Sequence, residues 1–119
     1  METVNQEKID ALKMAAEYMD KLIPSMEQVI SEIKGQQQPD TIDFLLQVIE
    51  GLNFMIETYN ATEDIVNGNE PLINRDVFEE VVGRLSDGFS KKDYKAIAGE
   101  LEESIIPFLK VFREAARRA

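Results

Sequence analysis

The stretch DTIDFLLQVIEGLNFMIETYNATEDIV, residues 40–66, indicates the fold class of this chain. Its apolar residues recur at intervals of three and four, which is the spacing of a buried face on a packed helix. Other apolar residues widen that face, so we expect several neighbouring helices to cover this one. The regular positions are Ile42, Leu45, Ile49, Leu52, Ile56 and Tyr59, and the residues that widen the face are Leu46, Val48, Phe54 and Met55. The stretch therefore predicts the central helix of a helical bundle.

A second long helix is predicted over residues 4–34, because apolar residues again recur there at intervals of three and four. Pro24 lies in its middle, lacks a backbone N–H and clashes with a carbonyl of the preceding turn. We expect either a kink or a break into two helices, and the continuous apolar pattern favours the kink. Gly35 ends this helix, and Asp40 or Thr41 caps the next one.

Two more helices are predicted after the stop signal at residues 67–71. The third covers about residues 75–89, and the fourth covers about residues 91–117 with a second kink at Pro107. Residues 8–24 and residues 91–107 match at several positions, including the proline. The similarity is either a duplication or a chance match between two amphipathic helices.

The third helix is predicted to be short, and it contains two glycines. Gly83 is expected to allow a neighbouring helix to come close, and Ser90 with Asp93 has the form of a capping box for the fourth helix. We expect Leu72 and Ile73 to fold the preceding connection back onto the core. The buried face of the third helix is expected to contain Phe78, Val81, Val82, Leu85 and Phe89.

These elements predict one all-α domain over residues 1–119, an up-down-up-down four-helix bundle. Helices 1 and 4 are kinked at proline, and helix 3 is short. The short helix leaves part of the apolar seam uncovered. That part would be filled by residues 69–74, by a dimer partner or by a ligand.

The amino-acid composition excludes several kinds of catalytic and metal-binding site. The chain has no cysteine and no histidine, which removes thiolate catalysis, zinc–sulfur sites and the commonest general base. Acidic pairs three or four residues apart are explained by solvated helix faces, and no calcium-binding loop is present. We therefore expect no catalytic residue, no cofactor and no metal site.

Charge and hydropathy restrict the partners. The net charge of −10 disfavours binding to nucleic acid and to anionic membrane surfaces. It would attract a basic partner protein, although it could simply maintain solubility. No apolar stretch is long enough to span a membrane, and we see no signal peptide, so a cytoplasmic location is expected.

A non-enzymatic protein-interaction module is the first functional hypothesis, either an adaptor or a chaperone-like bundle that binds a partner helix in an apolar groove. A structural homodimer, whose interface covers the seam that helix 3 leaves open, is the alternative. A protein that binds metal or a small ligand through carboxylates alone is the third hypothesis. Methionine surfaces can adapt to varied partners, but core filling would also explain them. The predicted partner-binding residues are Met19, Met26, Leu52, Met55 and Tyr59.

Residues 77–113 resemble known proteins in layout. A short helix ends in Gly88-Phe89, and a long amphipathic helix follows Lys91-Lys92-Asp93-Tyr94. This layout resembles the C-terminal half of small acidic flagellar export chaperones. It is also similar to small uncharacterised bacterial helical proteins with an Asp-Tyr helix start and a later Glu and Pro, here Glu103 and Pro107. The resemblance implies a bundle that binds a partner's helical segment without catalysis.

Overall fold

The computed structural model describes residues 2–67 and 75–119, which are all-α and contain no strand. The helices are α1 (Glu2–Lys34), α2 (Thr41–Val66), α3 (Arg75–Lys91), α4 (Tyr94–Glu100), the π-helix η1 (Leu101–Ile105) and α5 (Ile106–Arg118). Because α4, η1 and α5 follow one another without interruption, they form one long helix. The described residues thus contain four helices, which confirms the predicted all-α class. The expectation for Leu72 and Ile73 lies outside the described residues.

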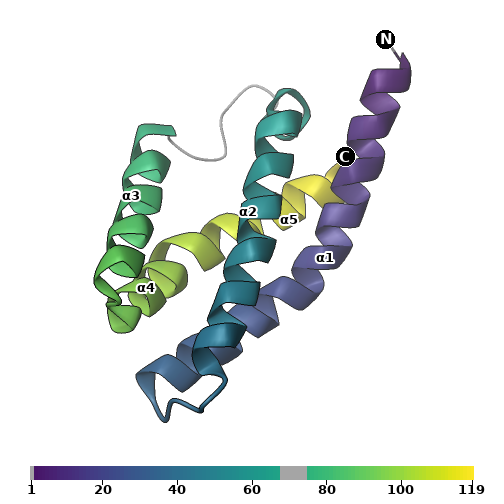
Figure 1. Ribbon diagram of the computed structural model, residues 1–119. Coiled ribbons are helices and arrows are strands. Elements are labelled where there is room, and N and C mark those ends of the chain that lie inside the picture. Colours follow the sequence, from purple (N-terminus) through teal and green to yellow (C-terminus); the bar gives the residue numbers. More distant parts are fainter. Residues whose placement is uncertain (1, 68–74) are drawn as a thin grey trace.

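Helices α1 and α2 lie side by side as a hairpin (Figure 1). Helix α1 continues through Pro24, so the alternative of a break is wrong. Asp40 occupies the N-cap position of α2, as predicted, but its side chain accepts no capping hydrogen bond. Thr41 is fully buried instead, and its hydroxyl accepts from the backbone N–H of Gln38 and donates to Glu32, both at 2.7 Å. Thr41 thus ties the start of α2 to the end of α1.

The turn between α3 and α4 corrects the predicted capping box. Ser90 is still inside α3, and Asp93 is the N-cap of α4, where its carboxylate accepts from the N–H of Ala96 at 3.2 Å. The N–H of Asp93 also donates to the carbonyl of Gly88 at 2.8 Å, which closes α3 with a Schellman motif. Lys92 has φ 56° at the left-handed position that glycine usually occupies.

Pro107 lies directly after the π-helix. Within η1 the backbone widens, and the N–H of Ile106 donates to the carbonyl of Leu101 five residues earlier. Proline cannot donate to the preceding turn and crowds its carbonyl, so a wider turn at this point accommodates the ring. Residues 91–93 form the end of α3 and the turn, whereas residues 8–10 lie inside α1, so the two segments with similar sequences differ in local structure.

Helix α1, rather than α2, contacts the most other elements, namely α2, α4, η1 and α5. The last helix crosses behind α2 and ends beside α1 (Figure 1). The expected covering of α2 by neighbouring helices is incomplete, because Leu46 is 47% exposed and Phe54 is 56% exposed. Val82 of α3 is also exposed, and a Cβ added at Gly83 would contact no other element within 4 Å. The close approach occurs instead at Gly88, where an added Cβ would lie 2.8 Å from Ile97.

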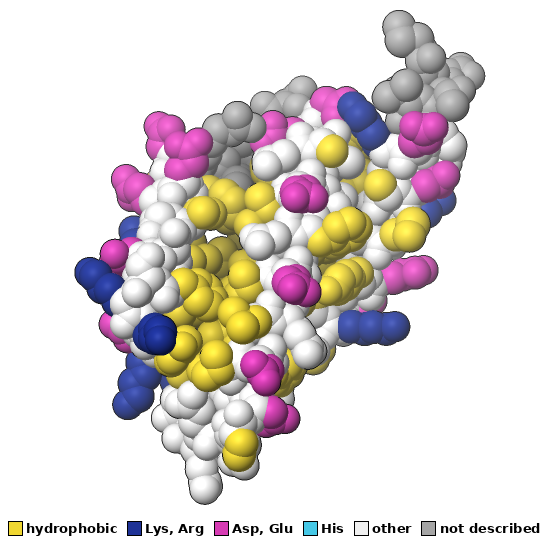
Figure 2. Space-filling model, viewed as in Figure 1, with side chains coloured by type: hydrophobic (Ala, Val, Ile, Leu, Met, Phe, Trp, Pro, Cys, Tyr) yellow, Lys and Arg dark blue, Asp and Glu magenta, His cyan; other side chains and the backbone are white. Residues whose placement is uncertain are grey.

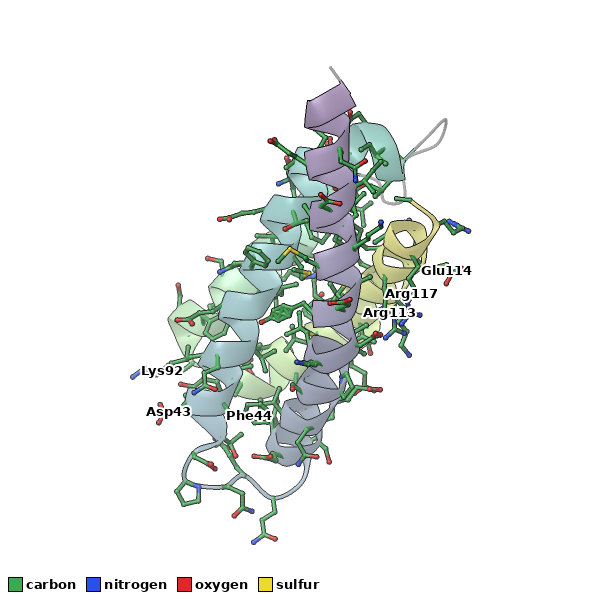
Figure 3. The ribbon with its side chains drawn as sticks, turned by 90° about the vertical axis from the view of Figure 1, so that its right-hand side faces the viewer. Asp43, Phe44, Lys92, Arg113, Glu114 and Arg117 are labelled. Carbon is green, nitrogen blue, oxygen red and sulfur yellow. The ribbon has the colours of Figure 1, made fainter. Side chains whose placement is uncertain are left out.

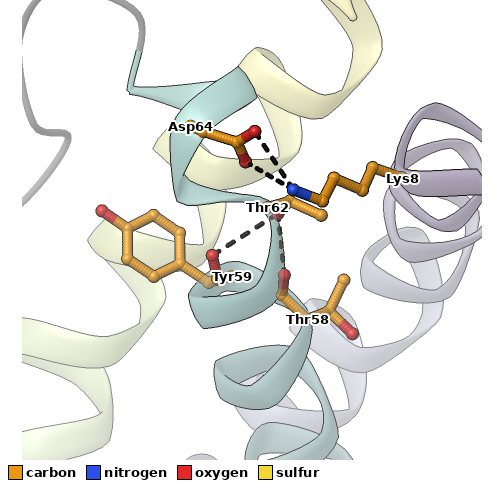
Figure 4. A network of polar contacts seen from close by, with 5 residues as sticks. All are labelled: Lys8, Thr58, Tyr59, Thr62 and Asp64. Carbon is orange, nitrogen blue, oxygen red and sulfur yellow. Dashed lines mark hydrogen bonds and ion pairs between the residues drawn. The ribbon is translucent and has the colours of Figure 1, made fainter. Parts of the chain in front are cut away.

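Ion pairs connect α1 with its neighbours, including one pair to α2 and two to α5. Lys8 pairs with Asp64 of α2 at 3.1 Å, beside the buried Thr62, whose hydroxyl donates to the carbonyl of Thr58 (Figure 4). Asp20 accepts from Arg113 at 3.2 Å and from Arg117 at 2.5 Å, and both arginines lie on α5 next to α1 (Figure 3). These partly exposed pairs set the register of the helices more than they stabilise the fold.

Candidate apolar docking surface

The five predicted partner-binding residues are all core residues. Each of their side chains is at most 3% exposed, so none of them lines an open groove in this structure. Tyr59 contacts the rings of Phe108 and Phe112 edge to face, and its hydroxyl donates to Asn67 at 2.9 Å. The core-filling role is the one observed for Met19, Met26, Leu52 and Met55. The open apolar surface lies on a different part of α2.

An isoleucine row runs along the flank of α2 that faces away from α1. Ile42, Ile49 and Ile56 define it, and all three are half-buried. Gly51 shows which flank meets α1, because an added Cβ there would come against Tyr18 and Leu22 of α1. At 100° per residue, the isoleucines lie about 140° to 180° around the helix from Gly51. This flank is therefore not covered by α1.

A hollow lined with hydrophobic side chains separates α2 from α3 (Figure 2). On α3, Phe78 and Phe89 are half-buried and Val82 is 40% exposed. These three lie on the flank away from Arg84, which pairs with Glu100 of α4 at 2.6 Å. We call the surface formed by these two flanks the α2–α3 groove, and we define it by the isoleucine row, Leu46, Phe78, Val82 and Phe89. Figure 2 shows hydrophobic side chains gathered between the two helices.

An acidic row lies beside the isoleucine row on α2. Asp43, Glu50 and Glu57 define it, and all three are exposed. Figure 2 shows acidic side chains along the middle of α2 with hydrophobic surface on both sides, and Figure 3 shows Asp43 on the outer side of the helix. None of the three forms an ion pair within the described residues. The seven-residue spacing is visible in the sequence and marks the outward face of α2.

A second hollow lies between α1 and the η1–α5 segment, with a volume of about 550 Å³. Ile30, Ile106 and Pro107 supply its apolar part. Its rim carries charges of both signs, and two of them, Lys34 and Glu102, pair across it at 2.6 Å. Four of its eight lining residues are charged, so the more apolar α2–α3 groove is the better candidate for a protein partner.

The arrangement and the pKa values of the titratable side chains give little indication of a catalytic or metal-binding site in the described residues. Among the described residues, no three carboxylates come together where they could hold a metal ion. The side-chain hydrogen bonds from Gln28 and Thr41 lower the pKa of the Glu32 carboxyl, and the hydrogen bond to Glu100 raises the pKa of Arg84. Both side chains are partly exposed to solvent, so their hydrogen bonds are ordinary surface interactions. No helix within the described ranges has the length and apolar character to cross a bilayer.

The chain belongs to the family described as Domain of unknown function (DUF8042), whose pattern matches residues 10–115. The match covers the described helices almost completely, so the family corresponds to this all-α unit. No curated protein and no solved structure matches the chain. None of these comparisons names a flagellar export chaperone, so that resemblance stays a prediction.

Proposed function

We propose that this chain is a non-enzymatic protein-interaction module, an adaptor or chaperone-like protein that binds a partner helix in the α2–α3 groove. The observation that supports it is the isoleucine row, a regular apolar row left half-open on a helix whose other side packs into the core. Apolar side chains at intervals of a helical repeat are the anchors that helix-in-groove recognition requires. The binding residues of this proposal are the groove residues in place of the five buried ones.

The α2–α3 groove exposes apolar surface that the apolar side chains of a partner would cover. Leu46 is 47% exposed and lies between the isoleucine row and the acidic row, where a partner could cover it completely. Covering a leucine of this exposure contributes roughly 1 kcal/mol to binding. The up-down-up-down order, the two proline kinks, the cytoplasmic location and the bacterial chaperone-like role all stay predictions within this proposal.

A matched pair of variants tests the proposal. Leu46→Asp places a charge in the groove, and Val111→Asp places the same charge on α5 at a residue that is 46% exposed. We expect proteins captured from a lysate of the native host by the unmodified chain to be retained by Val111→Asp and lost by Leu46→Asp. Circular dichroism checks that both variants fold. A captured set that both variants retain, or that both lose, would contradict the proposal.

Size-exclusion chromatography with light scattering on the same proteins tests the homodimer alternative. If the unmodified chain is a dimer and Leu46→Asp is a monomer, a second copy of the chain occupies the groove. If the unmodified chain stays monomeric over the concentration range, self-association is excluded and the groove is left for another protein.

A further inference from the structure

We infer that the partner of the α2–α3 groove is a basic amphipathic helix that lies along α2. This inference rests on the proposed function and names the chemistry of the partner. The isoleucine row and the acidic row both repeat every seven residues, at 42, 49 and 56 and at 43, 50 and 57. A seven-residue repeat on one helix matches the repeat on a second helix packed beside it.

The angle between the isoleucine row and the acidic row predicts where apolar and charged residues lie on the partner helix. Adjacent residues on a helix point about 100° apart, so the acids lie at the edge of the apolar row rather than within it. Leu46 lies between the two rows and is exposed. A partner helix over the isoleucine row and Leu46 would therefore place its own flanking positions opposite Asp43, Glu50 and Glu57. Lysine or arginine at those flanking positions would complement the acids, as charges beside the seam do in coiled coils.

The charge of the chain argues against a second copy as the occupant. A two-fold dimer through this flank would bring two acidic rows, and two chains of net charge −10, towards each other. Like charges across an interface oppose association, whereas a basic helix meets an attractive field.

Three peptides of about 18 residues serve as probes, long enough to span Ile42 to Ile56 at 1.5 Å per residue. The first has leucines on one helical face and lysines beside them, repeating every seven residues. The second has glutamate in place of each lysine, and the third has the composition of the first in an order without an apolar face. Fluorescence anisotropy measures their affinity for the full chain at low salt and at physiological salt.

Three forms of the protein complete the experiment. Asp43→Asn with Glu50→Gln and Glu57→Gln neutralises the acidic row. Its matched control is Glu7→Gln with Glu103→Gln and Glu114→Gln, which removes three exposed charges elsewhere. Figure 3 shows Glu114 on α5, on the side of the molecule away from Asp43. Leu46→Asp tests the apolar part of the surface.

The expected result is that the lysine peptide binds the unmodified chain and the control alike. Neutralising the acidic row should weaken its binding about tenfold and reduce its salt dependence, because three exposed charge pairs are lost. Leu46→Asp should weaken binding at least as much, by about tenfold or more, because the apolar contact is interrupted. The glutamate and reordered peptides should bind about tenfold more weakly than the lysine peptide, or not detectably.

Other outcomes overturn the inference in distinguishable ways. Equal binding of lysine and glutamate peptides, lost in Leu46→Asp, would overturn the basic partner but support the proposed groove. Equal loss in the acidic-row variant and its control would indicate attraction to the net charge alone. Binding of none of the peptides would overturn the basic helix, and the capture experiment with Leu46→Asp would still decide the proposed function.

Discussion

The two flanks of α2 have similar apolar character but differ in how they are covered. On the flank that meets α1, Gly51 lets the two helices come close, and Leu52 and Met55 are buried. On the opposite flank, Ile49 is half-buried and Leu46 is 47% exposed. The difference teaches that a helix can be apolar around most of its circumference without being the centre of the fold. The surplus apolar surface is then available to a partner.

We expect the largest difference in the free energy of unfolding between truncation of a buried side chain and truncation of an exposed side chain of α2. Met55→Ala leaves a cavity at a fully buried site, so we expect a loss of about 3 kcal/mol in the free energy of unfolding. Leu46→Ala removes a partly exposed side chain and should cost about 0.5 kcal/mol. Urea denaturation followed by circular dichroism measures both. Similar losses at the two sites would show that the groove is closed in solution.

Glycine replacements test the close approach of α1. Gly51→Ala would bring a Cβ against the hydroxyl of Tyr18 and to 3.0 Å from Leu22, so we expect a loss of about 1 kcal/mol in the free energy of unfolding. Gly83→Ala meets nothing within 4 Å on α3, and alanine is the better helix former, so it should stabilise by up to about 1 kcal/mol. Thermal unfolding compares the two. A stabilising Gly51→Ala would mean that the helices can separate without cost.

Removal of the Thr41 hydroxyl tests the junction between α1 and α2. Thr41→Val deprives the N–H of Gln38 and the carboxylate of Glu32 of a partner, at a cost of about 1 kcal/mol. The pKa of Glu32, lowered in the folded chain, should rise towards its ordinary value, which NMR titration of the carboxyl carbon detects. The lowered pKa means that this contribution to stability is present above the ordinary value and is lost as the pH falls. An unchanged pKa would show that the hydrogen bond from Gln28 alone is responsible.

Substitutions at the turn between α3 and α4 should give the smallest change in the free energy of unfolding. Lys92→Gly removes a side chain from a left-handed residue at φ 56°, so we expect a gain of about 0.5 kcal/mol. Lys95→Gly, inside α4, is the control and should destabilise by about 1 kcal/mol. Chemical denaturation measures both. A destabilising Lys92→Gly would indicate that the lysine side chain makes a contact that offsets the strain.

Part of the candidate surface could be read from the sequence. Ile42, Ile49 and Ile56 belong to the apolar seam, and Asp43, Glu50 and Glu57 repeat at the same spacing. The sequence did not separate the half-buried isoleucines from the fully buried Leu45 and Leu52, because all are equally apolar. It also placed the binding residues among the methionines, which the structure buries.

The sequence by itself determined the all-α class and the approximate bounds of the helices, because the helical period and the capping residues are local properties. Only the tertiary structure decided that α1 contacts the most other helices and that one flank of α2 remains open. Which flank of a helix is covered depends on contacts between residues far apart in the chain, and the local sequence pattern does not specify these contacts.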